Sequence, residues 1–347
     1  MKILIAASNM VHINNFHTPY INGLKSLGHD VRIMASGEGA DFDIPFQKRT
    51  FSVRNLLLIF KIRKIINQEK FDIIYLNTTL AAFFVRLAVL GMKKRPYVVN
   101  TVHGYLFDEH TGFIKRKLYI ACEKILRRVT DNIVVMNSED MSVAARFNLC
   151  IGKIFEIDGM GVDFDGRKIT KEPKTDENIN LTFVGEISKR KNQIFLVKAM
   201  KKLPEKYSLT LVGDGADRKK TERYIKRNKL SKRVRITGFT NNVYQYLAKT
   251  DIYVSASHIE GLPFNIMEAM YAKLPIVASD TKGSRDLLDD RHLYPYNNED
   301  EYIKLLKIVS IADTEYDTER YSLETVFPRN MEIYTSFIND EKIVKID

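Results

Sequence analysis

Two glutamates in the stretch IEGLPFNIMEAM (259–270) are the first residues whose types and spacing suggest chemistry. Glu260 and Glu268 lie eight residues apart around a Gly-Leu-Pro step. Because the fixed φ of proline suits the first turn of a helix, we place the helix start at Leu262–Pro263 and Glu260 in the preceding loop. The free N–H groups of such a helix start suit a phosphate, while one acid accepts from sugar hydroxyls and the other from a ribose. The alternative is two unrelated glutamates on a half-exposed helix.

Basic residues follow another strand-like run, FVGEISKRKNQ (183–193). Gly185 permits a tight turn there, and three bases precede the next helical pattern, a place that suits a diphosphate. A solvated basic turn is the alternative. The stretch LVGDGAD (211–217) is a second strand-to-glycine turn, although two glycines can simply close a turn. The residues concerned are Lys189, Arg190 and Lys191 in the first stretch, and Gly213 and Gly215 in the second.

The composition is that of a globular chain with an anionic partner. Its 347 residues suit two domains of roughly 150 residues each, and 45% hydrophobic with 28% charged residues excludes a disordered chain. The longest apolar stretches, 55–60 and 80–91, are too short or too charged to span a membrane, and the start MKILIA predicts no signal peptide. A net charge of +11 favours a phosphorylated ligand or an acidic membrane. Nucleic acid is disfavoured, because no aromatic residues interleave with the basic ones.

One basic helical stretch, KRKLYIACEKILRR (115–128), could rest on an anionic membrane. Its helical periodicity groups four apolar residues into one stripe and leaves most of the basic residues elsewhere. The alternative is a core-packed helix with a solvated basic face. The stripe consists of Leu118, Cys122, Ile125 and Leu126, and the predicted membrane-facing residues are Arg116, Lys117, Lys124, Arg127 and Arg128.

Short β-branched runs alternate with helical patterns along the whole chain, which predicts parallel sheets covered by helices. A polar segment without an apolar period, 161–180, is a predicted linker. We therefore expect two doubly wound Rossmann-like domains facing a central cleft, with ligands at the carboxyl ends of the strands. The predicted domains are 1–165 and 166–318, and a C-terminal helix within 319–347 is expected to pack back on the first domain. The predicted strands are 2–7, 30–35, 72–76, 97–101, 132–136, 153–157, 181–185, 208–212, 233–237, 251–255 and 275–279; the helices of the first half are 17–28, 53–69, 79–91, 113–129 and 138–147, with helices of about ten residues between the later strands and a last one near 320–340.

Several of these stretches together resemble one family. The segments 183–193, 211–217, 236–254 and 253–288 resemble, in order and spacing, the E-x7-E region of retaining nucleotide-sugar glycosyltransferases with the GT-B fold (family 4, group 1). The segment 100–140, which begins NTVHGYLFDEHTG, looks like the members that build bacterial capsular and extracellular polysaccharide. The resemblance runs from Met1 to about residue 310.

The resemblance implies a role for particular residues. Glu260 would bind the donor sugar, Glu268 the ribose, and Lys191 the leaving diphosphate, while His103 would approach the sugar from the first domain. A neutral capping or core histidine is the alternative for His103. The remaining residues of the implied donor site are Gly185, Arg190, Gly213, Gly215, Thr237, Gly238, Phe239, Gly261, Leu262, Pro263 and Phe264.

The sequence departs from the family at three places, one of which is Asp286, where a glutamate is commoner. Glu186 stands where arginine is usual, so we expect Arg190 to supply that positive charge. The first loop, 6–17, lacks the glycine pair of many relatives, which makes close approach to the donor phosphates less favourable there. We assign its polar residues to the acceptor, with a structural role as the alternative: His12, Asn14, Asn15 and His17.

The resemblance implies a retaining hexosyltransferase that uses a nucleotide-diphosphate sugar, with UDP favoured, and it assigns the acceptor to domain 1–165 and the donor to domain 166–318. It also implies no obligatory metal, in keeping with the lack of a D-x-D motif in a plausible strand-end loop. The expected acceptor is a polyprenyl-diphosphate-linked saccharide, so we expect a cytoplasmic protein on the inner face of the membrane. The alternatives are a nucleotide-sugar epimerase of the same fold and a non-catalytic protein that binds anionic membranes. A dehydrogenase is disfavoured, because no G-x-G-x-x-G follows either first strand.

Overall fold

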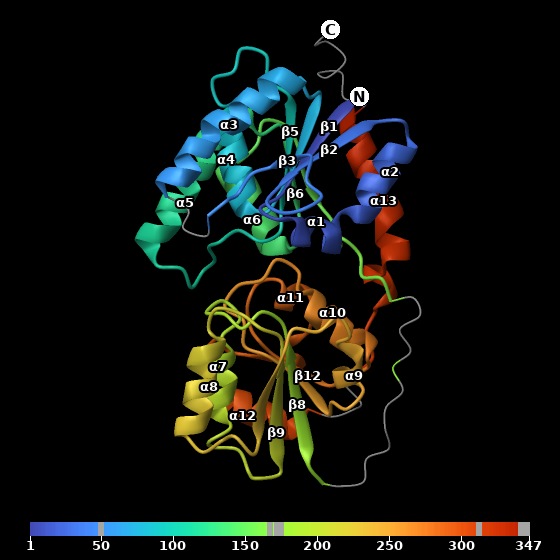
Figure 1. Cartoon of the computed structure of the whole chain (residues 1–347). Coiled ribbons are helices and arrows are strands. Elements are labelled where there is room, and N and C mark those ends of the chain that lie inside the picture. Colours follow the sequence, from blue (N-terminus) through green and yellow to red (C-terminus); the bar gives the residue numbers. More distant parts are fainter. Residues whose placement is uncertain (48–51, 165–168, 170–176, 310–313, 339–347) are drawn as a thin grey trace. The chain divides into compact units, whose positions relative to one another are not determined.

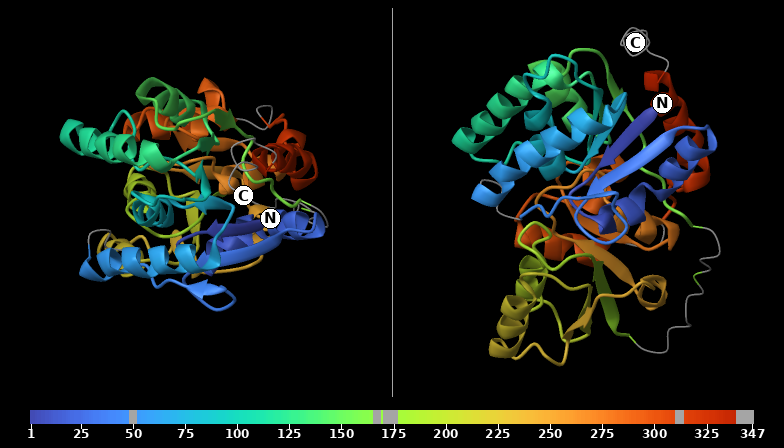
Figure 2. Two further views of the ribbon diagram at one scale, coloured as in Figure 1. Left: turned by 90° about the horizontal axis from the view of Figure 1, so that it is seen from above. Right: turned by 45° about the horizontal axis from the view of Figure 1, so that its top comes forward.

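The computed structural model describes two compact units of the chain. One comprises Met1–Gly161 together with the C-terminal segment that begins at Leu323, and the other comprises Val162–Ser322. Each unit is a parallel sheet with helices packed on it (Figures 1 and 2). Most of the predicted linker (161–180) and its domain boundary lie outside the described residues. The described residues are 1–47, 52–164, 169, 177–309 and 314–338.

The first unit contains a seven-stranded sheet in the order β3-β2-β1-β4-β5-β6-β7. All of its strand pairs are parallel, and the chain moves outward from β1 in one direction and then from β4 in the other. This is the doubly wound arrangement, with its switch point between β1 and β4. The strands are β1 (Lys2–Ala6), β2 (Asp30–Ala35), β3 (Phe42–Asp43), β4 (Ile73–Asn77), β5 (Tyr97–Val102), β6 (Asn132–Val135) and β7 (Ile154–Glu156).

Helices cover this sheet because its strands are apolar on both faces. All five residues of β4 are buried, as are all six of β5, which is typical of a central parallel strand. The helices are α1 (Met10–Phe16), α2 (Thr18–Ser26), α3 (Val53–Glu69), α4 (Thr79–Val89), α5 (Phe113–Leu126), α6 (Ser138–Phe147) and α13 (Leu323–Ile338).

The last helix, α13, is part of the first unit and packs on it through aromatic side chains. Tyr334 stacks on Tyr75 of β4 with ring centroids 4.9 Å apart, and the Tyr75 hydroxyl donates to the Tyr334 carbonyl at 2.8 Å. Asn330 Nδ2 donates to the Tyr20 hydroxyl at 3.0 Å and to the Gly159 carbonyl at 2.9 Å. These buried bonds fix α13 to α2 and to the sheet.

The second unit repeats the topology with six strands in the order β10-β9-β8-β11-β12-β13. Its switch point lies between β8 and β11, which are also parallel neighbours. Leu181, Phe183, Leu209, Leu211 and Val254 form the centre of its core. The elements are β8 (Ile179–Val184), α7 (Gln193–Ala199), β9 (Tyr207–Val212), α8 (Arg218–Arg227), β10 (Val234–Gly238), α9 (Tyr244–Leu247), β11 (Ile252–Ser255), α10 (Phe264–Tyr271), β12 (Ile276–Ser279), α11 (Ser284–Leu287), β13 (Leu293–Tyr294) and α12 (Glu299–Ile308).

The predicted fold class, two doubly wound parallel sheets, is confirmed. Three details were wrong. Helix α1 forms within the predicted first loop, since Asn9 caps it by accepting from the His12 N–H at 2.9 Å. The short elements β3, β13, α9 and α11 carry too few residues to show a period, and the two helices among them have four residues rather than ten. Helix α10 begins at Phe264, so Pro263 is the residue before the first turn rather than in it.

Candidate functional site

The loops at the carboxyl ends of β8, β9, β10 and β11 carry the predicted donor-site residues of the second unit. The loop after β8 and the loop after β11 meet at the switch point, the place where doubly wound sheets bind ligands. The structure therefore brings together residues that are about 70 positions apart in the sequence. They are Gly185, Arg190 and Lys191 after β8; Gly213 and Gly215 after β9; Thr237 and Gly238 at the end of β10, with Phe239 directly after it; and Glu260, Gly261, Leu262, Pro263, Phe264 and Glu268 after β11 or on α10.

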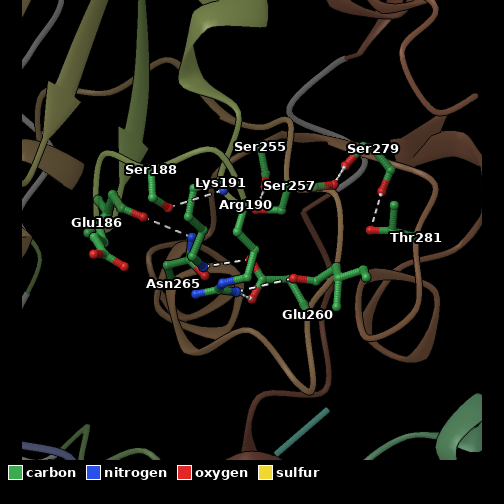
Figure 3. A network of polar contacts seen from close by, with 12 residues as sticks. Glu186, Ser188, Arg190, Lys191, Ser255, Ser257, Glu260, Asn265, Ser279 and Thr281 are labelled. Atoms are coloured by element: carbon green, nitrogen blue, oxygen red, sulfur yellow. Dashed lines mark hydrogen bonds and ion pairs between the residues drawn. The ribbon is translucent and has the colours of Figure 1, made fainter. Parts of the chain in front are cut away.

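Glu260 is the centre of this site, and two bases from the β8 loop bind it (Figure 3). Lys191 Nζ lies 2.6 Å from one carboxylate oxygen, and Arg190 Nη1 donates to the other at 2.7 Å. The Lys191 and Glu260 side chains are about nine-tenths buried, whereas the Arg190 side chain is 44% exposed. Arg190 also donates to the Ile259 carbonyl at 3.1 Å, so its guanidinium is tied to the β11 loop.

Burial and charge act on these groups in opposite directions. Burial alone would raise the pKa of Glu260, but the adjacent Lys191 and Arg190 charges and hydrogen bonds from Lys191 and Ser257 bring it down to about 2. Burial lowers the pKa of Lys191 although the Glu260 charge opposes this change. The site thus keeps a desolvated carboxylate ionised by means of two cations.

A set of uncharged hydrogen bonds, which no sequence pattern had predicted, supports this charge cluster. Asn265 Nδ2 donates to the Val184 carbonyl at 2.9 Å and to the Tyr253 hydroxyl at 2.7 Å, which ties α10 to β8 and β11. Ser279 Oγ donates to the Ser257 carbonyl at 2.7 Å, which holds the loop that leads to Glu260 (Figure 3). An asparagine in the first turn of a mostly apolar helix was the available signal for the first of these contacts.

The predicted glycines have a structural reason to be glycines. A Cβ on Gly213 would lie 2.1 Å from the Gly185 carbonyl oxygen, and one on Gly215 would lie 2.4 Å from the Ile187 carbonyl oxygen. The loops after β8 and β9 therefore pack backbone against backbone, which a side chain would prevent. Beside them, the ring of Phe239 is 79% exposed, while Gly238 is buried.

The second unit has one cavity beside the loop after β8 and a larger one at the opposite ends of its strands. One of about 210 Å³ is lined by residues of the β8 loop and its neighbours, among them Ser188, Lys189 and His258. Another of about 370 Å³ is lined by Asn180, Ser208 and residues at the other ends of the strands, and it includes neither Lys191 nor Glu260. The candidate site therefore lies at the switch point, where Lys191, Arg190 and Glu260 converge, and not in the larger cavity.

In the first unit, three of the predicted residues come together at the carboxyl edge of the sheet. His103 follows β5, and His12 and His17 lie on α1 and at its end, with ring centroids 4.7 Å (His12–His103) and 5.5 Å (His17–His103) apart. Asn14 and Asn15, which were assigned to the acceptor with them, are exposed on α1.

Thr78, at the first switch point, has an unusual backbone that sequence reasoning missed. Its φ is +81°, in the region that favours glycine, although threonine is β-branched. Its Oγ1 accepts from the Ser8 N–H at 2.9 Å and lies 2.7 Å from the Ser8 hydroxyl, which joins the loops after β1 and β4. Strained residues of this kind are concentrated at functional sites.

Helix α5 differs from the predicted arrangement. Leu126 of the predicted apolar stripe is buried, but Leu118 and Ile125 are more than half exposed. The inward position is taken instead by Glu123, which binds buried Arg86 of α4 through two hydrogen bonds of 2.7 and 2.9 Å. The exposed side of α5 carries Phe113, Ile114, Leu118 and Ile125 together with Lys115, Lys117 and Lys124, and Arg128, directly after the helix, is exposed as well, whereas Arg116 and Arg127 are half-buried.

Helix α3 exposes a second apolar row, which no sequence pattern had predicted. Val53, Leu56, Leu57 and Phe60 are exposed in its first two turns, beside Arg54, Lys61 and Lys64. Both α3 and α5 pack against α4 (Figure 1). In the described part of the chain, no helix is long and apolar enough to cross a bilayer.

Two family models match the chain. The model for glycosyl transferases group 1 matches residues 165–317, and the model for glycosyltransferase family 4 matches residues 20–154. Putative glycosyltransferase EpsD of Bacillus subtilis is 28% identical over 309 residues, which cover 83% of this chain and 81% of that protein. UDP-Gal:alpha-D-GlcNAc-diphosphoundecaprenol alpha-1,3-galactosyltransferase of Escherichia coli is 25% identical, and the match covers 76% of this chain and 73% of that protein.

Solved structures show the same fold. HepE of Anabaena in complex with UDP-glucose has a TM-score of 0.72 at 17% identity, and the match covers 97% of this chain and 100% of the HepE chain. Sucrose-phosphate synthase of Thermosynechococcus elongatus has a TM-score of 0.75 at 15% identity and covers 98% and 99%. At these identities the similarity concerns the fold alone. Together with the two family models, it establishes that the chain belongs to the group 1, family 4 glycosyltransferases with the GT-B fold.

Proposed function

We propose that this glycosyltransferase moves a sugar from a UDP-sugar to a lipid-linked saccharide, with retention of the anomeric configuration. The observation that carries the proposal is the Lys191–Glu260–Arg190 cluster at the second switch point, in which the Lys191 and Glu260 side chains are buried. Relatives named for transfer to undecaprenol-linked sugars support the acceptor class. The relative EpsD and a protein of a Klebsiella pneumoniae cps region support a role in surface polysaccharide synthesis.

The charge cluster suits the departure of a diphosphate. When the bond between the sugar C1 and the phosphate oxygen breaks, negative charge grows on the phosphate, and a preorganised cation lowers the free energy of that state. Lys191 is such a cation, because Glu260 holds it in place and burial strengthens its field. Gly261 and Leu262, just before α10, would place backbone N–H groups beside the same phosphate.

The state of Glu260 argues against a role as nucleophile. Its two oxygens already bind Lys191 and Arg190, and a carboxylate with a pKa of about 2 is a weak base. The acceptor hydroxyl would then attack C1 as the C1–phosphate bond breaks, and its proton would pass to the departing phosphate. This same-face displacement gives retention and requires no metal.

Product analysis tests the reaction. We would incubate the protein with a panel of UDP- and GDP-sugars, a polyprenyl-diphosphate sugar acceptor and EDTA, and follow products by mass spectrometry and NMR. We expect one added hexose from a UDP-sugar, with the anomeric configuration of the donor. An epimerised nucleotide sugar formed without acceptor would support the epimerase instead. An inverted linkage, or transfer abolished by EDTA, would overturn the mechanism.

We also propose that the exposed side of α5 lies on an anionic membrane. Ile114, Leu118 and Ile125 fall within about 40° around the helix axis, and Lys117 and Lys124 lie beside them. Apolar side chains flanked by lysines are typical of helices that lie in the lipid headgroup region. Such a placement would bring a lipid-linked acceptor to the first unit.

Flotation with anionic liposomes tests this placement. Replacing Lys117, Lys124 and Arg128 by glutamine should weaken binding by about 3 kcal/mol in total, since each charge near the surface contributes about 1 kcal/mol. The matched control removes three exposed charges from α8, namely Lys219, Lys226 and Arg227, and should float like the wild type. Equal recovery of both triple variants would contradict the proposal.

A further inference from the structure

Three histidines of the first unit converge on one point. One ring nitrogen of each histidine lies within 4.8 Å of a ring nitrogen of the other two, and His12 Nε2 lies 3.2 Å from His17 Nε2. His17 is 1% exposed, and His12 and His103 are partly buried. The cluster is made only of imidazoles and contains no carboxylate.

The fold explains why these three residues meet. Strands β1 and β5 both flank β4, so the segments that follow them leave the same edge of the sheet. His103 is the first residue after β5, and α1 follows β1. The break between α1 and α2 at His17 brings that side chain back to His12, five residues earlier, although a continuous helix would turn the two apart.

Hydrogen bonding does not account for the cluster. His12 and His17 can share one proton between their Nε2 atoms, but His103 Nε2 is buried and has no hydrogen-bond partner in the described part of the chain. A buried polar atom without a partner costs free energy, so its retention calls for a ligand. Imidazole nitrogens are the commonest metal ligands in proteins, so a metal ion is one ligand that would satisfy this atom.

We propose that His12, His17 and His103 form a binding site for a divalent transition-metal ion of the zinc class. In a tetrahedral zinc site with Zn–N bonds of 2.0–2.1 Å, ligand nitrogens lie about 3.3 Å apart, close to the 3.2 Å between His12 and His17. Imidazole ligands favour zinc over magnesium or calcium, which prefer oxygen. Three protein ligands leave a fourth position open to a small oxygen or nitrogen ligand. The proposal goes beyond the transfer reaction and does not rest on it, because the proposed transfer involves no metal.

Metal titration of the full-length protein without donor tests the site. We would measure Zn²⁺ binding by calorimetry and replace zinc by Co²⁺, whose visible absorption reports tetrahedral nitrogen ligands. One ion per chain is expected, and His12→Gln and His103→Gln should each weaken binding by at least about 10-fold. His110→Gln is the matched control, since His110 is an exposed histidine of the same unit.

Circular dichroism and the thermal midpoint without metal would show that the variants are folded. His12 is the first choice because its ring is less buried than that of His17. Zinc binding that is unchanged in both site variants, or lost equally in His110→Gln, would overturn the proposal. So would a wild-type protein that binds no zinc. These measurements read out metal binding and not transfer, so a failure here is distinguishable from a failure of the proposed reaction.

Discussion

The carboxyl edges of the two sheets share a topology but differ in charge. At the second edge, the buried carboxylate of Glu260 forms ion pairs with buried Lys191 and with partly exposed Arg190. At the first edge, the imidazoles of the histidine cluster are kept neutral by burial. One fold thus offers a charged site and an uncharged one, and the side chains on the loops decide which.

The difference has a physical consequence for what each edge can do. A buried cation that is held by its counter-ion can also bind a phosphate, because both interactions are strengthened by the low dielectric. Neutral imidazoles offer lone pairs and hydrogen bonds instead, which suit a metal or hydroxyl groups. Variants that remove one feature of either edge at a time can therefore separate the two.

Removal of the buried cation should have the largest effect. Lys191→Ala should lower turnover by about 10²–10³-fold at saturating substrates, the range seen when one preorganised donor to a developing oxyanion is lost. Glu260→Ala should lower it as well, since it removes the group that holds Lys191. Lys202→Ala and Glu205→Ala are controls, being exposed residues of the same unit with the same side chains. Wild-type rates in both site variants, with an unchanged fold, would remove the site assignment.

The free energy of unfolding should fall in acid, because protonation of Glu260 removes its interactions with Lys191 and Arg190. The pKa of Glu260 is about 2 in the folded protein against an ordinary 4.5, so its contribution is present above about pH 4.5 and is lost as the pH falls toward 2. The wild type should lose about 1 kcal/mol from this source by about pH 3.5 and about 3 kcal/mol by about pH 2. Urea unfolding at several pH values measures it. Glu260→Gln should lack this component, whereas Glu205→Gln should keep the wild-type pH dependence. Parallel curves for all three proteins would contradict the prediction.

Loss of the hydrogen bonds that Asn265 donates beside the charge cluster should have a smaller effect. Asn265→Ala removes two donated hydrogen bonds and leaves the Val184 carbonyl buried, so unfolding should become easier by about 1–3 kcal/mol. Asn241→Ala, at an exposed position in the same unit, should stay within about 0.5 kcal/mol of the wild type. Equal midpoints in chemical denaturation would show that α10 does not depend on Asn265.

The periodic parts of the fold were predictable from the sequence. Fully buried strands such as β4 and β5 leave long apolar runs, and α3 was predicted with its observed bounds because its periodicity spans 17 residues. Two-residue strands leave no period, so β3 and β13 were missed. Element type followed from local pattern wherever the pattern was long enough.

Which face of a helix is buried was not predictable for α5. Apolar residues at helical spacing indicate a stripe but not its direction, and a glutamate is normally placed outward. Here Glu123 points inward because Arg86, itself 1% exposed, neutralises it from α4. That pairing joins residues 37 positions apart, so no local pattern reports it.

The candidate site was likewise predictable only in part. The loops that carry it could be predicted, since strand ends and glycine turns are local features. The pairing of Glu260 with both Lys191 and Arg190 could not, because it depends on two loops that only the sheet brings together. Likewise, the three histidines were expected at a binding surface, but their mutual contact requires the break between α1 and α2.

The smallest predicted effect concerns the cap that positions the first edge. Asn9 accepts from the His12 N–H at 2.9 Å and so begins the helix that carries His12. Asn9→Ala should therefore lower the free energy of unfolding by about 1 kcal/mol, the usual cost of losing such a cap. Asn14→Ala, at an exposed position on the same helix, should change it by less than about 0.5 kcal/mol. Urea unfolding of both variants measures the difference. If the two variants are equally stable, α1 is held by packing of Met10 and Ile13 alone, and the position of His12 does not depend on its cap.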